Sequence, residues 1–440
     1  MGQVPAGRLY VSPRGEIIHT KADLAFRVHQ FMIRRGLFKA FWYVYRHKNP
    51  YQGVDPRRLD LIYLFRPLFG NPPIYRVLRE MLDDRLLCRQ LGFTDRQIDK
   101  GLTRRKDRRF NPIGEKTIGN YGRWWLEGLN QARLRQIVLA IGRQKELPSK
   151  VLTMDCTFIE TYGSKMEKRA KGYDGTWGYK VGVVHQADHG REYILAARIY
   201  PANRNDSGIA PDLIEDLAYR TKLKGKLLLV DKGFQNEPLF EAMKEKHGLS
   251  VLIRLRSDTN LEHLAINRVG RRRFYRVERA PGLVVARLRM KDYKSGMFDV
   301  IAVQDERANR DSGLRRKAWS YFLTTDRSMS PLKVYRTYAR RWLIENQVFK
   351  KLKWDELHLT PLNSGNWNFI NLHVFSSLMM RNILLLYSRK TGTSMDEIIR
   401  IIGAKKSEAY FRRYGNRLVR LPDDEVRTRG ITRWIGSHPA

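Results

Sequence analysis

Cysteine is nearly absent from this sequence: its 440 residues include only Cys88 and Cys156, and no Cys-x-x-Cys pair occurs. Two distant cysteines cannot build a disulfide framework or a cysteine-ligated zinc finger, and their scarcity suits a reducing cytoplasm. The ten histidines include no His-Glu-x-x-His motif, which argues against a zinc hydrolase. We therefore expect an intracellular protein without zinc.

Acidic residues are scarce relative to basic ones. There are 45 Asp and Glu against 83 Lys and Arg, which gives a net charge of +38 and a pI of about 10.4. A compact protein tolerates such self-repulsion most easily when its partner is a polyanion. The basic residues are spread along the chain, so we expect a long nucleic-acid footprint. A basic housekeeping protein of the ribosomal kind shares the charge, but rarely this length together with nine tryptophans.

Long apolar runs are lacking as well. The most apolar stretch, VFSSLMMRNILLLYS at 374–388, is too short to span a bilayer and contains Arg381. The N-terminus has no apolar signal core, and we find no internal repeat or low-complexity segment. We therefore expect a soluble cytoplasmic protein with no membrane partner.

The first third of the sequence has a helical pattern. Apolar residues recur at helical spacing through most of 1–147, after a loose arm of about 18 residues. Within it, 79–102 reads as a capped helix, a glycine turn and a further helix, which is the pattern of a helix-turn-helix. Any small bundle with short turns gives the same pattern. We predict that 1–147 is a helical DNA-binding region.

After Pro148 the pattern changes to short β-type runs separated by helices. The order β-β-β-α-β-α-β predicts a mixed α/β sheet of five strands with flanking helices, in a catalytic domain whose first part is 148–256. The strands are expected at VLTMD (151–155), GYKVGVVHQA (178–187), EYILAARIY (192–200), KLLLVD (226–231) and LSVLIRLR (249–256), with helices at 209–222 and 236–247.

The remaining chain divides into three parts. We predict a β-rich insertion at 257–326, a second part of the catalytic domain at 327–390 and a basic helical C-terminal region at 391–440. The second catalytic part contains a predicted helix that begins at Ser330-Pro331. On a regular α-helix Tyr338, Arg341 and Glu345 share one face. An amphipathic surface helix with a solvated Glu–Arg pair would read the same way.

Two acids follow strands that are expected to lie side by side. Asp155 ends VLTMD and Asp231 ends KLLLVD, with Gly233 allowing the chain to turn. Two like charges at one sheet edge are costly unless a cation neutralises them or one acid is protonated. Glu345 would add a third carboxylate, and three suit two Mg²⁺ ions roughly 4 Å apart, with Mn²⁺ as a substitute. Each Asp alone is more commonly a plain strand-end residue, and Glu356 is the fallback for Glu345.

These residues carry a family resemblance. Asp155 with Thr157, then Asp231 in LLLVDKGF, then Tyr-x-x-Arg-x-x-x-Glu ending at Glu345 resemble the DDE insertion-sequence transposases of the Tyr-Arg-Glu-Lys type. The segment 172–207 is similar to the strand hairpin and Asn/Asp turn of that family. The resemblance covers about 150–356. It implies a ribonuclease-H-like catalytic fold with a large β insertion between the second Asp and the Glu.

The resemblance also implies a function. The protein would be a cut-and-paste DNA transposase of a prokaryotic cytoplasm, associated with the nucleoid. Its N-terminal region would bind terminal inverted repeats, and a homodimer would pair two transposon ends. It would hydrolyse the 3′ ends with Mg²⁺ and join them to target DNA. The alternatives are another two-metal nuclease or DNA-joining enzyme on this fold, and a DNA-binding descendant of a transposase that no longer cuts.

DNA contacts also follow from the resemblance. Tyr338 and Arg341 would grip phosphates near the cleaved end, as suits a bidentate guanidinium. Trp319 of the insertion would stack on an unpaired base, although large aromatics more often form a core. Other aromatics of the insertion open to both interpretations are Phe274, Tyr275 and Phe298.

One position departs from the family pattern. The family has a Lys seven residues after its Glu, and Leu352 stands there in this chain. Lys351 and Lys353 flank it, and Lys353 lies nearer to the face of Glu345 by helical angle. Its long side chain can reach a phosphate, so we assign the role to Lys353.

Overall fold

The computed structural model forms two compact units. Unit 1 comprises 1–140, 163–167 and 351–440, and unit 2 comprises 141–162 and 168–350. The predicted boundary near 147 is close to the first division, and 351–390 lies in the same compact unit as 1–140. The structure describes residues 9–12, 15–39, 54–102, 112–125, 127–163, 165–257, 259–269, 275–280, 282–290, 297–311, 313, 318–355, 357, 359–360, 362, 364–404, 409–414 and 417–421.

Unit 1 is mainly helical, and local sequence signals start several of its helices. Asp55 caps α3 through the backbone N–H of Arg57, with Pro56 in the first turn, and Thr94 with Gln97 forms a capping box on α6. The helices are α1 (Asp23–Arg34), α3 (Pro56–Phe65), η1 (Arg66–Phe69), α4 (Ile74–Glu80), α5 (Arg85–Gln90), α6 (Asp95–Lys100), α7 (Glu115–Trp124), α8 (Glu127–Arg143, ending in unit 2), η6 (Lys351–Asp355), α14 (Trp367–Thr391) and α15 (Met395–Ala404).

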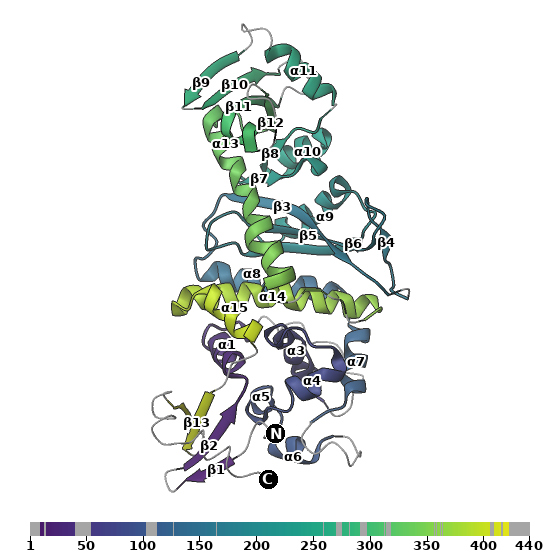
Figure 1. The fold of residues 1–440 in the computed structure, drawn as a ribbon, viewed down its shortest axis with the longest axis vertical. Helices are drawn as coiled ribbons and strands as arrows, with labels where there is room; N and C mark the ends of the chain where they lie inside the picture. Colours follow the sequence, from purple (N-terminus) through teal and green to yellow (C-terminus); the bar gives the residue numbers. More distant parts are fainter. Residues whose placement is uncertain are drawn as a thin grey trace. The chain divides into compact units, whose positions relative to one another are not determined.

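Helix α14 forms the core of unit 1. The side chain of Asn366 caps its start, and Gly392 ends it with a left-handed φ of 78°. It packs on α3 and α7 (Figure 1), where a Cβ at Gly122 would lie 2.6 Å from the Phe369 ring, so only glycine fits. By length and composition α14 could cross a membrane, but its apolar stretch is completely buried inside the protein, as in a core helix.

The two ends of the described chain meet in a small sheet. Strands β1 (Leu9–Ser12), β2 (Gly15–Thr20), β13 (Ala409–Tyr414) and β14 (Arg417–Arg420) pair in the order β1-β2-β13-β14 (Figure 1). The predictions of a loose N-terminal arm and of a helical C-terminal region are therefore wrong for these segments. Their pairing joins residues about 390 positions apart along the chain, which local periodicity cannot reveal.

A buried ion pair lies among the helices of unit 1. The Arg133 guanidinium donates to Asp60 Oδ2, and both side chains are at most 2% exposed. The Tyr121 hydroxyl donates to Asp60 Oδ1 at 2.6 Å, and the Trp125 ring lies 4.0 Å from the Arg133 guanidinium carbon. One cation, one anion and two aromatic rings close this site to water. We refer to Asp60 and Arg133 as the sealed ion pair.

Unit 2 is built on one large mixed sheet. Among the described residues of this unit, ten strands pair in the order β4-β5-β3-β7-β8-β12-β11-β10-β9, with β6 on β5. Strands β3, β7 and β8 are parallel and the other pairings are antiparallel. The strands are β3 (Val151–Glu160), β4 (Ala170–Lys171), β5 (Trp177–Gln186), β6 (Ile194–Pro201), β7 (Leu227–Val230), β8 (Ser250–Arg254), β9 (Tyr275–Ala280), β10 (Leu283–Arg289), β11 (Asp299–Asp305) and β12 (Ser320–Thr324).

The mixed α/β fold is confirmed, and it is consistent with a ribonuclease-H-like core. All five strands predicted between 151 and 256 are present, as β3, β5, β6, β7 and β8. The five-stranded sheet itself is not found, because the predicted β insertion continues it: β12 pairs with β8, Leu323 opposite Ile253. An open β8 edge would be a pairing hazard, and the insertion covers it.

Helices cover both faces of this sheet. Helix α13 (Pro331–Tyr338) packs Val334 and Tyr338 on Leu229, Leu252 and Phe322. Helices α9 (Asp206–Ala218), α10 (Glu237–His247) and α11 (Asn260–Val269) lie on the other side in Figure 1. Unit 2 also contains the short segments η2 (Lys232–Phe234) and α12 (Glu306–Asp311). Alternating apolar side chains in the strands supply both cores.

The helix predicted at 331–354 is not one regular α-helix. Helix α13 ends at Tyr338, and η4 (Ala339–Arg341) follows as one 3₁₀ turn. The segments η5 (Ile344–Phe349) and η6 are then π-wound, with i→i+5 hydrogen bonds. The change in winding begins where Arg341 and Glu345 approach the sheet, so tertiary contacts override the uniform helical propensity of the sequence.

Candidate active site at the β3–β7 edge

Asp155 and Asp231 are brought together by strand register. Strand β7 runs parallel to β3 with Met154 opposite Val230, so the next residue on each strand is an aspartate. The predicted end of the first strand is wrong: β3 continues to Glu160 because its far half still pairs with β5. Asp155 therefore sits where β7 leaves β3, and Asp231 is the first residue beyond β7.

Gly233 serves a different purpose from the one predicted. It lies in η2 without a positive φ, so the turn itself does not require glycine. A Cβ at this position would come 2.6 Å from Asp206 Oδ2. A larger residue at this position would therefore have to displace the Asp206 carboxylate at the start of α9.

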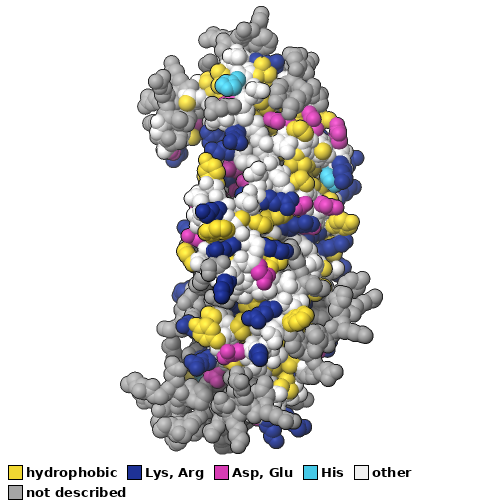
Figure 2. Space-filling view, turned by 90° about the vertical axis from the view of Figure 1, so that its right-hand side faces the viewer, with side chains coloured by type: hydrophobic (Ala, Val, Ile, Leu, Met, Phe, Trp, Pro, Cys, Tyr) yellow, Lys and Arg dark blue, Asp and Glu magenta, His cyan; other side chains and the backbone are white. Residues whose placement is uncertain are grey.

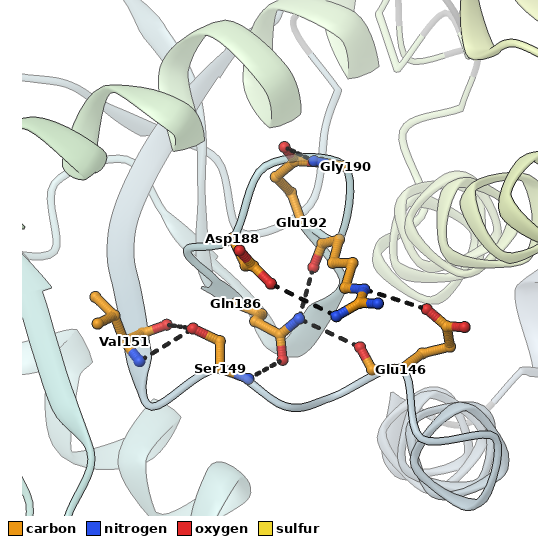
Figure 3. A network of polar contacts seen from close by, with 8 residues as sticks. Glu146, Ser149, Val151, Gln186, Asp188, Gly190 and Glu192 are labelled. Carbon is orange, nitrogen blue, oxygen red and sulfur yellow. Dashed lines mark hydrogen bonds and ion pairs between the residues drawn. The ribbon is translucent and has the colours of Figure 1, made fainter.

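A polar network fixes the entry into β3. The Gln186 amide at the end of β5 accepts a hydrogen bond from the Ser149 N–H at 3.2 Å and donates to the Glu146 carbonyl at 3.3 Å (Figure 3). Arg191 Nε lies 3.5 Å from Glu146 Oε2, and Ser149 Oγ bonds both polar groups of the Val151 backbone. The strand that carries Asp155 therefore starts from a fixed position.

Arg341 stands between the two aspartates. Its Nη1 donates to Asp155 Oδ2 at 3.1 Å, and its Nε lies 3.9 Å from Asp231 Oδ1. The Asp155 and Arg341 side chains are about one tenth exposed, whereas that of Asp231 is 39% exposed. We refer to Asp155, Asp231 and Arg341 as the two-aspartate site. It is buried on one side and open to water on the other.

The electrostatics of this site are unbalanced. Burial is the largest cause that raises the pKa of Asp155 to about 7; the nearby charges of Glu345 and Asp231 act in the same direction, against the opposing effects of the Cys156 N–H and Arg341. One guanidinium is shared by two aspartates, and Glu345 adds a third negative charge to the field. A site with more acids than bases attracts a further cation.

The predicted metal cluster is not assembled in this structure. Within the described ranges, no three His, Cys, Asp or Glu side chains are close enough to hold one metal ion. The physical reason is that Arg341 takes the place between Asp155 and Asp231. Its Nε is buried and makes no hydrogen bond there, so the guanidinium fits this place imperfectly. Two carboxylates from adjacent strands are oxygen donors that fit a hard divalent cation.

Tyr338 is positioned differently from the prediction. Its hydroxyl donates to the Val230 carbonyl at 3.3 Å, and its ring packs 5.0 Å from the Phe322 ring with only 8% of the residue exposed. Burial raises the pKa of this phenol to about 12. Tyr338 therefore holds the end of β7, directly before Asp231, and a phosphate contact would require it to become exposed.

The other residues that were predicted to contact DNA differ in how exposed they are. Leu352 is fully buried, which explains an apolar residue at the family's lysine position, and Lys351 and Lys353 are half-buried. Trp319 is half-buried before β12. Phe298 is 0% exposed and belongs to the core, so its stacking role is excluded. Phe274, the Tyr275 side chain and the fallback Glu356 lie outside the described residues.

A pocket beside Asp231 was not predicted. It has a volume of about 820 Å³ and is lined by Tyr173, Asp231, Lys232, Gly233, Arg256, Ser257 and Thr259. We refer to it as the flank pocket. Lys232 falls inside the Asp-x-Gly-aromatic motif, so the motif contained a signal for it. Nothing in the sequence linked Tyr173 or Arg256 to Asp231. On the face drawn in Figure 2, Lys and Arg side chains are distributed over the described surface.

Comparisons with known proteins give one family match. The family described as "Transposase DDE domain" matches residues 146–383, which is more than half of the chain. No curated protein matches the chain. One solved structure that matches is the cryo-EM structure of a piggyBac transposase synaptic complex with hairpin DNA, at 12% sequence identity, with 87% of this chain and 79% of that chain covered and a TM-score of 0.43.

Proposed function

The chain belongs to the transposase DDE domain family, and we propose that it acts on DNA as a cut-and-paste transposase of the Tyr-Arg-Glu-Lys type. It would cleave the 3′ ends of a transposon and join them to target DNA in the cytoplasm of a prokaryotic cell, on the nucleoid. The single observation that carries the proposal is the parallel β3–β7 register, which sets Asp155 beside Asp231 at an edge open to water.

Asp155, Asp231 and Glu345 are the residues that would hold Mg²⁺ or Mn²⁺. Bound there, the two ions would supply Lewis acidity for a water or 3′-hydroxyl nucleophile and for the leaving oxygen. The chain's own contribution is orientation. The Val230–Tyr338 hydrogen bond fixes the β7 end, and the network at Gln186 fixes the start of β3.

Arg341 would change partners during this reaction. In the structure it neutralises the two aspartates. When a divalent cation takes over that role, the guanidinium is free to donate two parallel hydrogen bonds to a DNA phosphate. The exposed Trp342 ring, 4.7 Å from the Arg341 guanidinium carbon, would guide it towards the surface.

Binding of the DNA is the remaining part of the proposal. The helical N-terminal region would recognise the terminal inverted repeats, and a homodimer would pair two ends. Lys353 would contact a phosphate, with Lys351 beside it, and Trp319 would stack on an unpaired base. The net charge of +38 supports a polyanionic partner and predicts a steep dependence of binding on salt.

The test is Mg²⁺-dependent cleavage and strand transfer with a duplex that carries the repeat-ended DNA beside the gene. Glu345→Gln should abolish both reactions and leave binding of the duplex unchanged. The matched control is Glu160→Gln, an exposed acid at the far end of β3, which should cut like the parent. Cleavage without joining would favour another nuclease on this fold. Binding without any cleavage by the parent would favour a descendant that no longer cuts.

A further inference from the structure

The flank pocket presents an aromatic side chain that the fold does not need for its core. Tyr173 is fully exposed, yet it lines the pocket together with Asp231. Large aromatics normally bury their rings, because burial of a ring stabilises the fold. The Tyr173 ring adds little to the core, and beside Asp231 it is available to a ligand.

The turn that presents Tyr173 is firmly built. The Gly172 N–H donates to the Thr176 carbonyl at 2.7 Å, and the Thr176 N–H donates to Asp174 Oδ1 at 3.0 Å. Gly175 adopts a left-handed φ of 81°, as tight turns require. The exposure of Tyr173 is therefore a property of an ordered hairpin turn between β4 and β5.

The base of this hairpin is anchored on the sheet. The Trp177 ring lies 4.3 Å from the Arg169 guanidinium carbon. A Cβ at Gly178 would come 2.2 Å from the Ile159 carbonyl oxygen, so β5 can pass β3 only with glycine there. The hairpin is held at the strand that carries Asp155, and its tip has a fixed relation to the two-aspartate site.

Two cations line the same pocket, and neither is paired with an anion among the residues that the structure describes. Throughout the described chain, neither the Lys232 ammonium nor the Arg256 guanidinium forms an ion pair or hydrogen bond, and both residues are exposed. Neighbouring arginines are engaged, as Arg254 is with Ser320 Oγ. Two free cations and one free aromatic ring around one pocket make up the features that bind a nucleotide without regard to base identity.

From these contacts we propose that the flank pocket is a subsite for the nucleotide next to the scissile phosphate. Tyr173 stacks on its base, and Lys232 and Arg256 hold its phosphates. The inference rests on the proposed function, because Asp231 is shared between the pocket and the two-aspartate site. Tyr173 is a positioning residue: it fixes the DNA strand so that the scissile phosphate lies at the acids.

The experiment combines a protein variant with a modified substrate. Cleavage is measured for the parent and for Tyr173→Ala on repeat-ended duplexes in which one nucleotide at a time, on either side of the cut, is abasic. Loss of stacking should lower kcat/KM about tenfold. The abasic site at one flanking position should cause the same loss in the parent and no further loss in Tyr173→Ala, because both changes remove one contact. Tyr173→Phe should keep full activity.

Controls separate this inference from the proposed function. Tyr219→Ala removes another exposed tyrosine, which lines a different pocket between α9 and α10, and it should cut normally. DNA binding is measured in Ca²⁺ at several salt concentrations. Lys232→Ala and Arg256→Ala should each reduce by about one the slope of the logarithm of the binding constant against the logarithm of the salt concentration. One outcome is that the parent cuts DNA while the loss of kcat/KM from an abasic site adds to the loss from Tyr173→Ala at every position. That outcome refutes the subsite and leaves the proposed transposase function intact. If the parent neither cuts nor joins DNA, the proposed function fails first.

Discussion

Each unit of this protein contains a buried arginine that pairs with aspartate, and the two sites differ in charge balance and in access to water. In the sealed ion pair, Arg133 meets one acid, and Tyr121 and Trp125 close the site. In the two-aspartate site, Arg341 is shared by two acids, one of which is 39% exposed. Burial alone therefore does not separate a structural pair from one that is proposed to be reactive.

This contrast shows what a ligand site requires. In a balanced, enclosed ion pair neither side chain is expected to change partner, because removing either charge leaves the other uncompensated in the interior. An arginine that faces excess negative charge at an open edge can be displaced by a stronger cation. The comparison predicts different responses of the two sites to the same substitutions, pH changes and ions.

The largest expected effect is on folding. Arg133→Met should lower the free energy of unfolding by about 3–5 kcal/mol at neutral pH, because it leaves Asp60 buried without its cation. Arg341→Met should lower it by less than about 1 kcal/mol, since Asp231 reaches water and Asp155 can take up a proton. Urea unfolding of the two variants measures both values. The double variant Asp60→Leu with Arg133→Met should recover most of the loss, and equal losses in the two single variants would contradict the comparison.

The second effect is a gain in stability. The pKa of Asp155 is about 7 in the folded protein, against an ordinary value of 3.8. A raised folded pKa means that folding takes up a proton, so this stability is present below the ordinary pKa and is lost as pH rises towards the folded value. Asp155→Asn has no carboxyl group to ionise and so does not lose stability in this way. Above the folded pKa of Asp155, its free energy of unfolding should exceed that of the parent by about 2–4 kcal/mol.

Thermal unfolding in EDTA at several pH values measures this difference. It should be small near pH 4 and should grow to its full size by about pH 8, in step with ionisation of Asp155. Asp155→Asn should also be unable to cleave DNA. A difference that does not change with pH would show that Asp155 has an ordinary pKa in the folded protein.

The third effect is on metal binding. Mg²⁺ at a hundred times its dissociation constant should stabilise the parent by about 2.7 kcal/mol. Asp155→Asn should lose this shift, because it removes one of the proposed ligands. Arg341→Gln should reach the same stabilisation at a roughly tenfold lower Mg²⁺ concentration, because the competing guanidinium is gone. The tenfold difference corresponds to about 1.4 kcal/mol in the free energy of Mg²⁺ binding. Differential scanning calorimetry across a Mg²⁺ series measures all three. If Arg341→Gln and the parent respond at the same concentration, Arg341 does not compete with the metal.

The smallest effect concerns Tyr338. Tyr338→Phe removes one hydrogen bond to the Val230 carbonyl and should lower the free energy of unfolding by about 0.5–1.5 kcal/mol. Cleavage should fall by only a few fold, through looser placement of Asp231. A large loss of DNA cleavage with unchanged stability would instead support the phosphate contact that the sequence suggested.

The sequence predicted features that depend on local pattern and on strand ends. The five apolar runs between 151 and 256 all became strands, and the expected side-by-side position of the strands that lead to Asp155 and Asp231 is confirmed. This was predictable because apolar strands of a mixed sheet are short, continuous and bounded by turns. The helix entry at Ser330 was equally local, and its side chain caps α13 as expected.

The features that could not be predicted depend on distant partners. Nothing near β8 indicates that β12 would extend the sheet, and nothing near residue 18 indicates a partner strand beyond residue 408. The position of Arg341 between the aspartates required three separate segments in space. Tyr173 beside Asp231 is of the same kind, since a hairpin tip acquires its neighbours only through tertiary structure.

The π winding that follows Arg341 has a consequence for how this chain is aligned with its relatives. A π turn takes up one residue more than an α turn, so after the π segment η5 a given face returns one position later in the sequence. The family spacing of seven residues from Glu to Lys then corresponds here to eight, which is the spacing from Glu345 to Lys353. At the family's lysine position this chain would thus have Leu352 because the basic residue is moved one position along the sequence to Lys353, and not because it is lost.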